Sequence, residues 1–269
     1  MNLSRRFFVA AAAVLFACSG AVSASSNAKP LVVGMELAYP PFEMTDPSGK
    51  PTGVSVDLAT DLAKSLGRPV VIQNISFDGL IPALKTGKVD LVISSMTATA
   101  ERAKSIDFSD PYISTGLCLL LKKDSTVQGV ADLDRPGVKV AVKKGTTGHL
   151  YATGNLKKAD ILVLDKDSAA VLEVSQGKAD AFIYDQMSTY QNWQRNQATT
   201  RAILEPFQKE SWAVGIRQGN DELKAQVNAF IKDYRAQGGF EKLGDRYLKD
   251  MKAEFKRLGS AFFLRSSLL

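Results

Sequence analysis

The sequence predicts an α/β protein built from two lobes with a cleft between them. The pattern Gly-Lys-x-Asp occurs twice, at residues 87–90 and 177–180, each time between an apolar helix-like run and an apolar strand-like run. Each glycine suits the C-terminal end of a helix, and each strand then runs into polar residues, Ser94-Ser95 or Tyr184-Asp185. Ligands of open α/β sheets bind beyond the carboxyl ends of the strands. One such unit in each half therefore predicts two lobes with facing strand ends.

The length allows this arrangement, because 269 residues suffice for two hydrophobic cores. We expect lobe 1 to be discontinuous, from residues 30–114 and 213–256, and lobe 2 to span 115–212. Crossover strands near 112–117 and 209–213 would act as hinges, since no low-complexity linker separates the lobes. The apolar and basic tail, 257–269, is expected to be loosely ordered.

Apolar spacing predicts the elements of each lobe. Helices are expected over residues 54–66, 79–86, 168–176, 186–195, 221–236 and 240–250, with another after residue 148. Strands are expected over residues 31–35, 70–75, 89–93, 116–121, 138–142, 161–164, 179–184 and 212–216. The Tyr-Pro-Pro-Phe run at 39–42 predicts a rigid loop, because proline fixes its own φ and favours an extended residue before it.

The first 24 residues have the features of an export signal, so we expect a periplasmic protein. Arg5 and Arg6 precede an apolar run over 7–17, and the Val-Ser-Ala run at 22–24 fits a small-residue cleavage site. A twin-arginine export route is an alternative to ordinary secretion, and a lipid anchor at Cys18 is another.

Composition excludes several kinds of function. Cleavage would remove Arg5 and Arg6 and lower the formal net charge from +6 to +4. The lysines are scattered without a basic stripe, which argues against nucleic-acid binding. Cys118 would be the remaining cysteine, in an apolar run, so no internal disulfide forms and we expect the thiol to be buried. The lone His149 excludes a histidine-rich metal site, and we expect neither a metal nor a cofactor.

Residues 94–102 leave a strand end and enter a helix, and they carry serine and threonine hydroxyls and one guanidinium. This set suits a carboxylate, which Arg102 can bind through two N–H groups with help from Thr97. The alternative is that Arg102 pairs with Asp107 or Glu101 on the surface.

Residues 143–148 form a second candidate, a loop rich in glycine and threonine between a strand and a helix. Its N–H groups could bind an anion, but its spacing is not that of a phosphate loop. An ordinary helix start with Thr146 or Thr147 as N-cap is the alternative. Asp185, at a strand end, could accept from an ammonium or cap the helix that follows.

Aromatic residues and one acid complete the candidate site. Tyr39, Phe42 and Phe77 could form walls for a ligand side chain, although single aromatics usually belong to the core. Glu36 follows a buried strand, where a carboxylate needs a partner or water.

Five segments together resemble the amino-acid-binding periplasmic proteins of ABC importers, family 3 of the extracellular solute-binding proteins. They run in family order across residues 30–250 and read VGMELAYPPFE (33–43), FDGLIPAL (77–84), SSMTATAER (94–102), IDFSDPY (106–112) and VAVKKGTT (140–147). The resemblance implies the two-lobed periplasmic-binding-protein fold of type II, with two crossover hinge strands. Binders of glutamine, of lysine, arginine and ornithine, or of histidine are the nearest group.

The resemblance also implies how the ligand backbone is held. Arg102 would bind the α-carboxylate, with help from Thr97 and from Thr147 of the other lobe. Asp185 would bind the α-ammonium, beside the backbone carbonyl of Ser95.

It further implies how the ligand side chain is held. Tyr39 and Phe77 would sandwich that side chain. Its tip would face Glu36, Ser94 and Lys143.

The ligand's identity rests on a few of these residues. Many relatives have aspartate in place of Glu36, and glutamine binders often have histidine in place of Tyr184. Ionised Glu36 accepts and Lys143 donates, so a primary amide would satisfy both, which favours glutamine. A cationic side chain would suit Glu36 and the faces of Tyr39 and Phe77, but Lys143 would oppose it. Glu36 and Lys143 could also pair with each other across a closed cleft.

These observations predict a monomeric binding protein that captures a polar L-amino acid, glutamine-like by preference, and delivers it to ABC permease subunits in the inner membrane. An enzyme resembling cyclohexadienyl dehydratase, on the same fold, is the alternative, and it would need a general acid and no α-amino-acid grip. Because the chain has both Arg102 and Asp185, we expect no catalytic residues. A sensor domain of a receptor is a third alternative, which the lack of a transmembrane partner segment disfavours.

Overall fold

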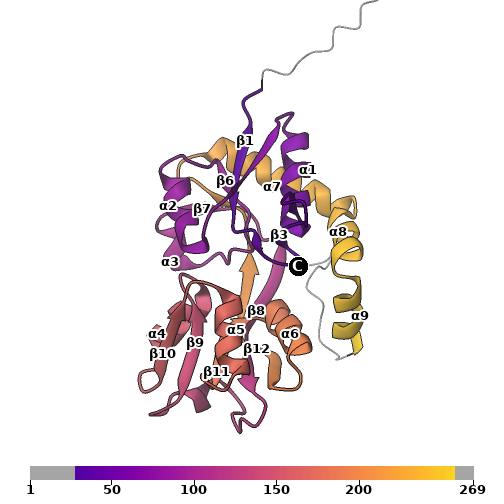
Figure 1. Ribbon diagram of the computed structural model, residues 1–269. Coiled ribbons are helices and arrows are strands. Elements are labelled where there is room, and N and C mark those ends of the chain that lie inside the picture. Colours follow the sequence, from indigo (N-terminus) through magenta and orange to yellow (C-terminus); the bar gives the residue numbers. More distant parts are fainter. Residues whose placement is uncertain (1–27, 258–269) are drawn as a thin grey trace, which may run out of the picture.

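Two lobes, each built around a five-stranded sheet, make up the computed structural model (Figure 1). The structure describes residues 28–257. The expected signal at 1–24, with Cys18, and the tail residues 258–269 lie outside the described residues. No helix within residues 28–257 is long and apolar enough to cross a membrane.

The elements alternate between strand and helix along most of the chain. The strands are β1 Leu31–Met35, β2 Ala38–Tyr39, β3 Glu43–Thr45, β4 Pro51–Thr52, β5 Val70–Asn74, β6 Leu91–Val92, β7 Asp107–Phe108, β8 Ile113–Lys122, β9 Lys139–Lys143, β10 Asp160–Leu164, β11 Ala181–Asp185, β12 Thr200–Trp212 and β13 Gly215–Ile216. The α-helices are α1 Val54–Ser65, α2 Leu80–Lys85, α3 Ala100–Ala103, α4 Thr147–Asn155, α5 Asp167–Ser175, α6 Gln186–Arg195, α7 Asp221–Ala236, α8 Gly239–Tyr247 and α9 Lys249–Arg257. Two 3-10 turns are η1 Phe77–Gly79 and η2 Val130–Leu133.

The sheet of lobe 1 has the order β5-β1-β6-β13-β7, and that of lobe 2 has the order β10-β9-β11-β8-β12. In each sheet, three neighbouring strands are parallel and the remaining pairings are antiparallel. The strands β1, β8 and β11 are buried along almost their whole length, because helices cover both faces of such sheets. The predicted two-lobed α/β fold is therefore confirmed.

The repeated Gly-Lys-x-Asp pattern makes the same helix ending in both lobes. Gly87 and Gly177 follow α2 and α5 with φ of 75° and 71°, a conformation that favours glycine. The Gly87 N–H donates to the carbonyl of Leu84, and the Gly177 N–H donates to the carbonyl of Val174. The next N–H in each copy reaches one residue further back, which completes a Schellman motif.

The aspartate of each repeat ties neighbouring strands together. Asp90 accepts a 3.0 Å hydrogen bond from the backbone N–H of Val32 in β1. Asp180 accepts a 2.9 Å hydrogen bond from the backbone N–H of Lys139 at the start of β9. The sequence repeat is thus a structural repeat, which sets helix, turn and strand in the same relation in both lobes.

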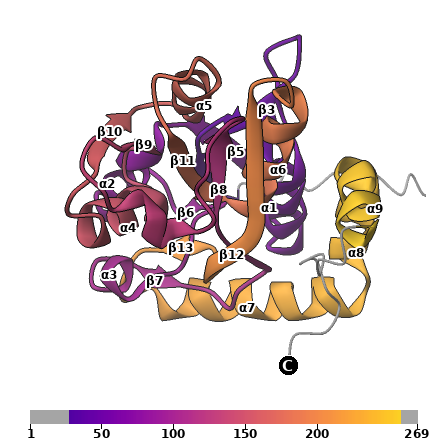
Figure 2. The ribbon, with the colours of Figure 1, turned by 90° about the horizontal axis from the view of Figure 1, so that it is seen from below.

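The chain passes between the two sheets twice, between β7 and β8 and between β12 and β13. Strands β8 and β12 run side by side along the middle of the molecule and remain paired as far as Ile113 and Trp212 (Figures 1 and 2). Their register shifts between Ile203 and Gln208, where Pro206 cannot donate to the ladder. The lobe boundaries expected from the sequence remain a prediction, since β8 runs through the first of them.

The structure corrects several expected elements. The loop expected over 39–42 is the turn at residues 40–42, and the sequence did not indicate the small sheet β2-β3-β4 that this turn belongs to. The strand expected over 89–93 is the two-residue β6. The strand expected over 212–216 is divided, because Trp212 ends the 13-residue β12 and Gly215–Ile216 form the separate strand β13. The helix expected over 240–250 is two helices, α8 and α9, that meet at Leu248.

Helix α9 brings the C-terminal segment against lobe 2. Phe255 lies 5.2 Å from Tyr190 of α6, measured between ring centroids, and only 1% of Phe255 is exposed. Figure 1 shows α9 running beside α6. The break at Leu248 is what turns the chain toward this contact.

Elsewhere in lobe 2, the thiol of Cys118 is buried and forms no disulfide, as expected.

Candidate functional site

All ten residues expected at the ligand site line one cavity between the lobes. Six further residues complete its wall: Glu43, Leu117, Thr146, Tyr184, Glu210 and Trp212. That this wall binds a ligand remains a prediction. Within residues 28–257, no group of His, Cys, Asp and Glu side chains is placed to hold a metal ion.

Arg102 enters the cavity from the short helix α3, whose first turn is capped by Thr99. Its guanidinium donates to the carbonyl of Thr97 at 2.7 Å and, across the cleft, to the carbonyl of Gly145 at 3.0 Å. Only 7% of the residue is exposed. The alternative of a surface pair is wrong, because Glu101 pairs with Lys104 instead.

Burial also affects the charge of this group. It lowers the pKa of Arg102 to about 10, while the negative charge of Glu210 acts in the opposite direction. The guanidinium therefore stays positive at neutral pH. It uses two of its five N–H groups on carbonyls, so donors remain for an anion.

Thr97 and Thr147 both turn their hydroxyls toward Glu210. The two hydroxyls donate to the same carboxylate oxygen, Oε2, at 2.9 and 3.0 Å. Thr147 is free for this contact because its neighbour Thr146 is the N-cap of α4 and accepts from the N–H of His149. Of the two expected N-caps, Thr146 is therefore the one observed.

Asp185, at the end of β11, is both a helix cap and a cavity residue. Its Oδ1 accepts from the backbone N–H groups of Met187 and Ser188, which caps α6, and from the Tyr39 hydroxyl at 2.7 Å. The other oxygen, Oδ2, takes part in none of these three bonds. Burial raises the pKa of Asp185 to about 6, and the hydrogen bonds to the carboxylate oppose this rise.

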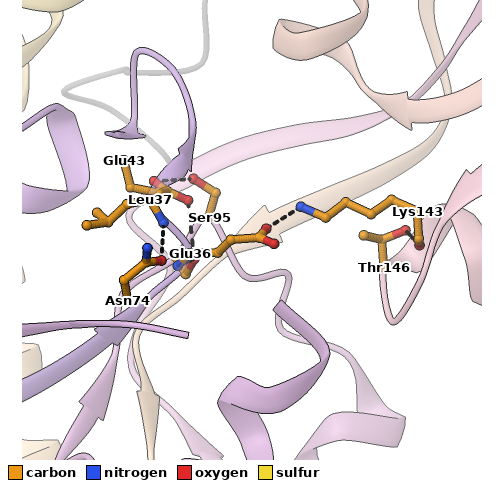
Figure 3. A network of polar contacts seen from close by, with 8 residues as sticks. Glu36, Leu37, Glu43, Asn74, Ser95, Lys143 and Thr146 are labelled. Atoms are coloured by element: carbon orange, nitrogen blue, oxygen red, sulfur yellow. Dashed lines mark hydrogen bonds and ion pairs between the residues drawn. The ribbon is translucent and has the colours of Figure 1, made fainter. Parts of the chain in front are cut away.

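Glu36 and Lys143 form a buried ion pair across the cleft (Figure 3). Their side chains are 13% and 3% exposed. The Glu36 backbone N–H also donates to the hydroxyl of Ser94 at 3.0 Å. Of the arrangements considered from the sequence, the one found is the mutual pair, which leaves neither group free in this state.

Glu43 is a second buried acid beside the cavity, with 1% exposure. It accepts a 3.0 Å hydrogen bond from the hydroxyl of Ser95 (Figure 3). It also accepts from the hydroxyls of Ser55 at 2.6 Å and, more weakly, Ser94 at 3.4 Å. Burial raises the pKa of Glu43 to about 8, against the effect of these serines. Ser95 itself has φ of 47°, an uncommon conformation for a residue with a side chain.

Aromatic rings close two sides of the cavity. Tyr39 stacks on Phe42 at 5.4 Å between centroids and meets Trp212 edge-on at 6.0 Å. Phe77 lies under two cations, 5.4 Å from the Arg102 guanidinium carbon and 5.7 Å from the Lys143 ammonium nitrogen. Phe42 and Tyr39 are also core residues, as the simpler interpretation of the sequence had it.

The lobes are therefore joined across the cleft by polar contacts. Besides those already described, Lys144 and Asp78 pair at 2.9 Å near the rim. The structure thus describes a closed cleft.

Sequence reasoning did not assign Glu43 or Glu210 to the site. Glu43 directly follows the Pro-Pro-Phe run, and Glu210 stands two residues before Trp212. For Glu43 the available signal was an acid between two apolar residues, Phe42 and Met44, since such a group needs a partner when it is buried. The neighbours of Glu210 in the sequence, Lys209 and Ser211, are polar and gave no such signal.

The fold and the polar cleft define a two-lobed α/β binding protein. Residues 31–250 match the family model of bacterial extracellular solute-binding proteins, family 3. The chain belongs to this family, as its sequence motifs predicted.

Named relatives span most of the chain. The L-cystine-binding protein TcyJ of Escherichia coli (strain K12) is 30% identical over 234 residues, covering 86% of this chain and 87% of that protein. The L-arginine-binding protein of Pseudomonas aeruginosa is 32% identical over 228 residues, covering 81% and 88%. The ABC transporter glutamine-binding protein GlnH of Bacillus subtilis (strain 168) is 27% identical, covering 83% of each.

Solved structures agree with this assignment. The ancestral amino acid-binding protein AncCDT-1, described as a precursor of cyclohexadienyl dehydratase, has 39% identity and a TM-score of 0.74, covering 81% of this chain and 95% of that one. A putative ABC transporter binding component from Wolinella succinogenes, complexed with lysine, has 34% identity and a TM-score of 0.76, with the same coverage.

Proposed function

We propose that this chain is a periplasmic substrate-binding protein that captures a polar L-amino acid and delivers it to the permease of an ABC importer. The observation that carries the proposal is the placement of Arg102 and Asp185. One comes from each lobe, both are buried, and both line the same cavity. A guanidinium and a carboxylate so placed match the two charges of an amino acid.

The α-carboxylate would bind at Arg102. Three of its N–H groups are not used on carbonyls, and burial strengthens a charge-assisted hydrogen bond. Thr97 and Thr147 stand at the same end of the cavity, through their shared contact with Glu210.

The α-ammonium would bind at Asp185 and the backbone carbonyl of Ser95. An ammonium beside Asp185 would lower its raised pKa and favour the ionised form. Because Arg102 belongs to lobe 1 and Asp185 to lobe 2, the same ligand would stabilise the closed state.

Tyr39 and Phe77 would hold the ligand side chain, with Glu36, Ser94 and Lys143 at its tip. The glutamine-like preference expected from the sequence requires that Glu36 and Lys143 both hydrogen-bond to one side-chain amide of the ligand. In the closed cleft Glu36 and Lys143 form an ion pair with each other, so an amide would have to break that pair in order to bind both groups.

The charge of the cavity favours a cationic side chain instead. The carboxyl groups in its wall belong to Glu36, Glu43, Asp185 and Glu210. The cationic groups belong to Arg102 and Lys143. With its pKa near 8, Glu43 is largely neutral at pH 7, so three carboxylates face two cations. We infer that arginine or lysine suits this cavity better than glutamine, which remains the alternative.

A dehydratase is the second candidate function, and one observation favours it. Glu43 is a buried acid that still holds its proton near neutral pH, a property that a general acid requires. Against it, the ammonium partner Asp185 stands in the cavity, and the relatives described above are named as binding proteins.

Native mass spectrometry of protein purified from the periplasm tests the proposal. A co-purified mass equal to one amino acid supports it, and removal of that ligand should be reversed by adding the same amino acid. Saturable conversion of prephenate or arogenate to an aromatic product would support the dehydratase instead.

A further inference from the structure

Glu210 is a buried carboxylate at the meeting point of both lobes and the second crossover strand. It lies on β12 and is 9% exposed. Its Oε2 accepts the hydroxyls of Thr97 and Thr147, and its Oε1 accepts a 2.9 Å hydrogen bond from the side-chain amide of Gln208. A buried carboxylate with three donors is held in one place.

The two threonines come from different lobes. Thr97 precedes α3 in lobe 1, whereas Thr147 is the first residue of α4 in lobe 2. Glu210 itself pairs with Thr115 in the crossover ladder between β8 and β12. One oxygen atom therefore links lobe 1, lobe 2 and the hinge. If the lobes parted, Glu210 could keep at most one of the two threonines.

This contact also decides what the threonines offer a ligand. Each hydroxyl has a single hydrogen, and both hydrogens point to Glu210. The backbone N–H of Thr147 has no acceptor within its own helix, because it belongs to the first turn of α4. A ligand carboxylate is thereby directed to this N–H and to the Arg102 guanidinium.

Glu210 supports Arg102 without occupying its N–H groups. It belongs to none of the ion pairs found within residues 28–257. Its charge nonetheless acts on the guanidinium and favours the protonated form. The hydroxyls satisfy Glu210, so Arg102 remains available.

We propose that Glu210 is a positioning residue for ligand capture, which holds Thr97 and Thr147 together across the closed cleft and so stabilises the closed state around the ligand. This rests on the amino-acid-binding function proposed above. The residue acts through the two threonines and does not need to touch the ligand.

The test compares three variants of the full mature protein: Glu210→Ala, Glu210→Gln and the control Glu205→Ala, an exposed acid on the same strand. Calorimetry with L-arginine and with L-glutamine gives the affinities, and X-ray scattering gives the radius of gyration with and without ligand. Glu210→Ala should bind ten- to a hundredfold more weakly, since it loses hydrogen bonds to a charged acceptor, and it should be more expanded without ligand. Glu210→Gln keeps an acceptor oxygen and should recover to within about fivefold of wild type.

Thr147→Val decides the matter if Glu210→Ala does not fold. Valine keeps the shape and the backbone N–H but removes the hydroxyl, so this variant should also weaken binding. Where both single variants fold, the double variant Glu210→Ala/Thr147→Val should bind only slightly more weakly than the weaker of the two single variants. The reason is that Glu210 and Thr147 act through one contact.

Two results would overturn the proposal. One is a Glu210→Ala protein with wild-type affinity and wild-type radius of gyration, and the other is full additivity in the double variant. If wild type binds no amino acid at all, the proposed function fails instead. The expansion of the unliganded Glu210→Ala protein then still tests the link between the lobes.

Discussion

The hydroxyl of Tyr39, in lobe 1, donates a 2.7 Å hydrogen bond to the carboxylate of Asp185, in lobe 2. Tyr39 stands beside the Pro-Pro run, and Asp185 ends a buried strand 146 residues later. The bond connects the proposed ammonium site to the aromatic wall. It also lowers the pKa of Asp185, which burial raises.

Tyr39→Phe should therefore change how ligand binding depends on pH. Loss of the hydroxyl raises the pKa of Asp185 above its value of about 6, and only the ionised form binds an ammonium well. Affinity should fall as the pH drops through about 6 in wild type, and at a higher pH in the variant. Calorimetry at pH 5.5, 6.5 and 8 checks this, and identical pH profiles would contradict it.

Arg102→Ala should weaken binding at least about a hundredfold while the protein stays folded. Charge-assisted hydrogen bonds contribute roughly 1.5–3 kcal/mol each, and a bidentate pair would be lost. Arg102→Lys keeps the positive charge but lacks the planar, forked guanidinium, so its affinity should lie between those of wild type and Arg102→Ala. Arg135→Ala, an exposed arginine in lobe 2, is the matched control. Near-wild-type affinity of Arg102→Ala would contradict the assignment of Arg102 to the ligand α-carboxylate.

Glu43 should make the protein less stable as the pH rises. Its pKa is raised from 4.5 to about 8, so the folded state holds this proton more tightly than the unfolded chain does. The free energy of unfolding should fall between about pH 4.5 and 8, by on the order of a few kcal/mol. Glu43→Gln should remove this contribution to the pH dependence of the free energy of unfolding.

Urea denaturation at pH 5 and pH 9 measures the difference. Glu205→Gln changes an exposed acid on β12 and should leave the slope as in wild type. Parallel slopes for wild type and Glu43→Gln would mean that Glu43 titrates normally.

Phe255→Ala should destabilise the protein by about 3–5 kcal/mol, because it leaves a cavity where α9 packs on Tyr190 of α6. Leu172→Ala, at a site that is 51% exposed, should cost much less. Urea denaturation of both variants checks the prediction. Equal losses would show that α9 contributes little to the packing of the two lobes.

Much of the fold follows from local pattern. Gly87 and Gly177 end helices because the left-handed conformation there favours glycine, and Asp90 and Asp180 follow in register. The cavity residues in these two units stand at strand ends, which the parallel order of the sheets brings to the cleft. Short motifs in the sequence therefore suffice to predict these candidate residues.

What the sequence did not indicate depends on distant pairing. Glu210 reaches Thr97 and Thr147 only because β12 pairs with β8 through a shift in register near Pro206. No local spacing encodes that pairing. The break at Leu248 carries no Gly or Pro signal either, and it serves packing against α6, a helix of the other lobe.

The most direct test of the account is a thermal-shift screen of the twenty amino acids on the mature protein. Saturation at about a thousand times Kd adds roughly 4 kcal/mol, which should raise Tm by several degrees. We expect arginine or lysine to give the largest rise, and aspartate and glutamate the smallest among the polar amino acids. A larger shift with glutamine would restore the amide interpretation of Glu36 and Lys143. No shift with any amino acid would contradict the proposal that this cleft binds one.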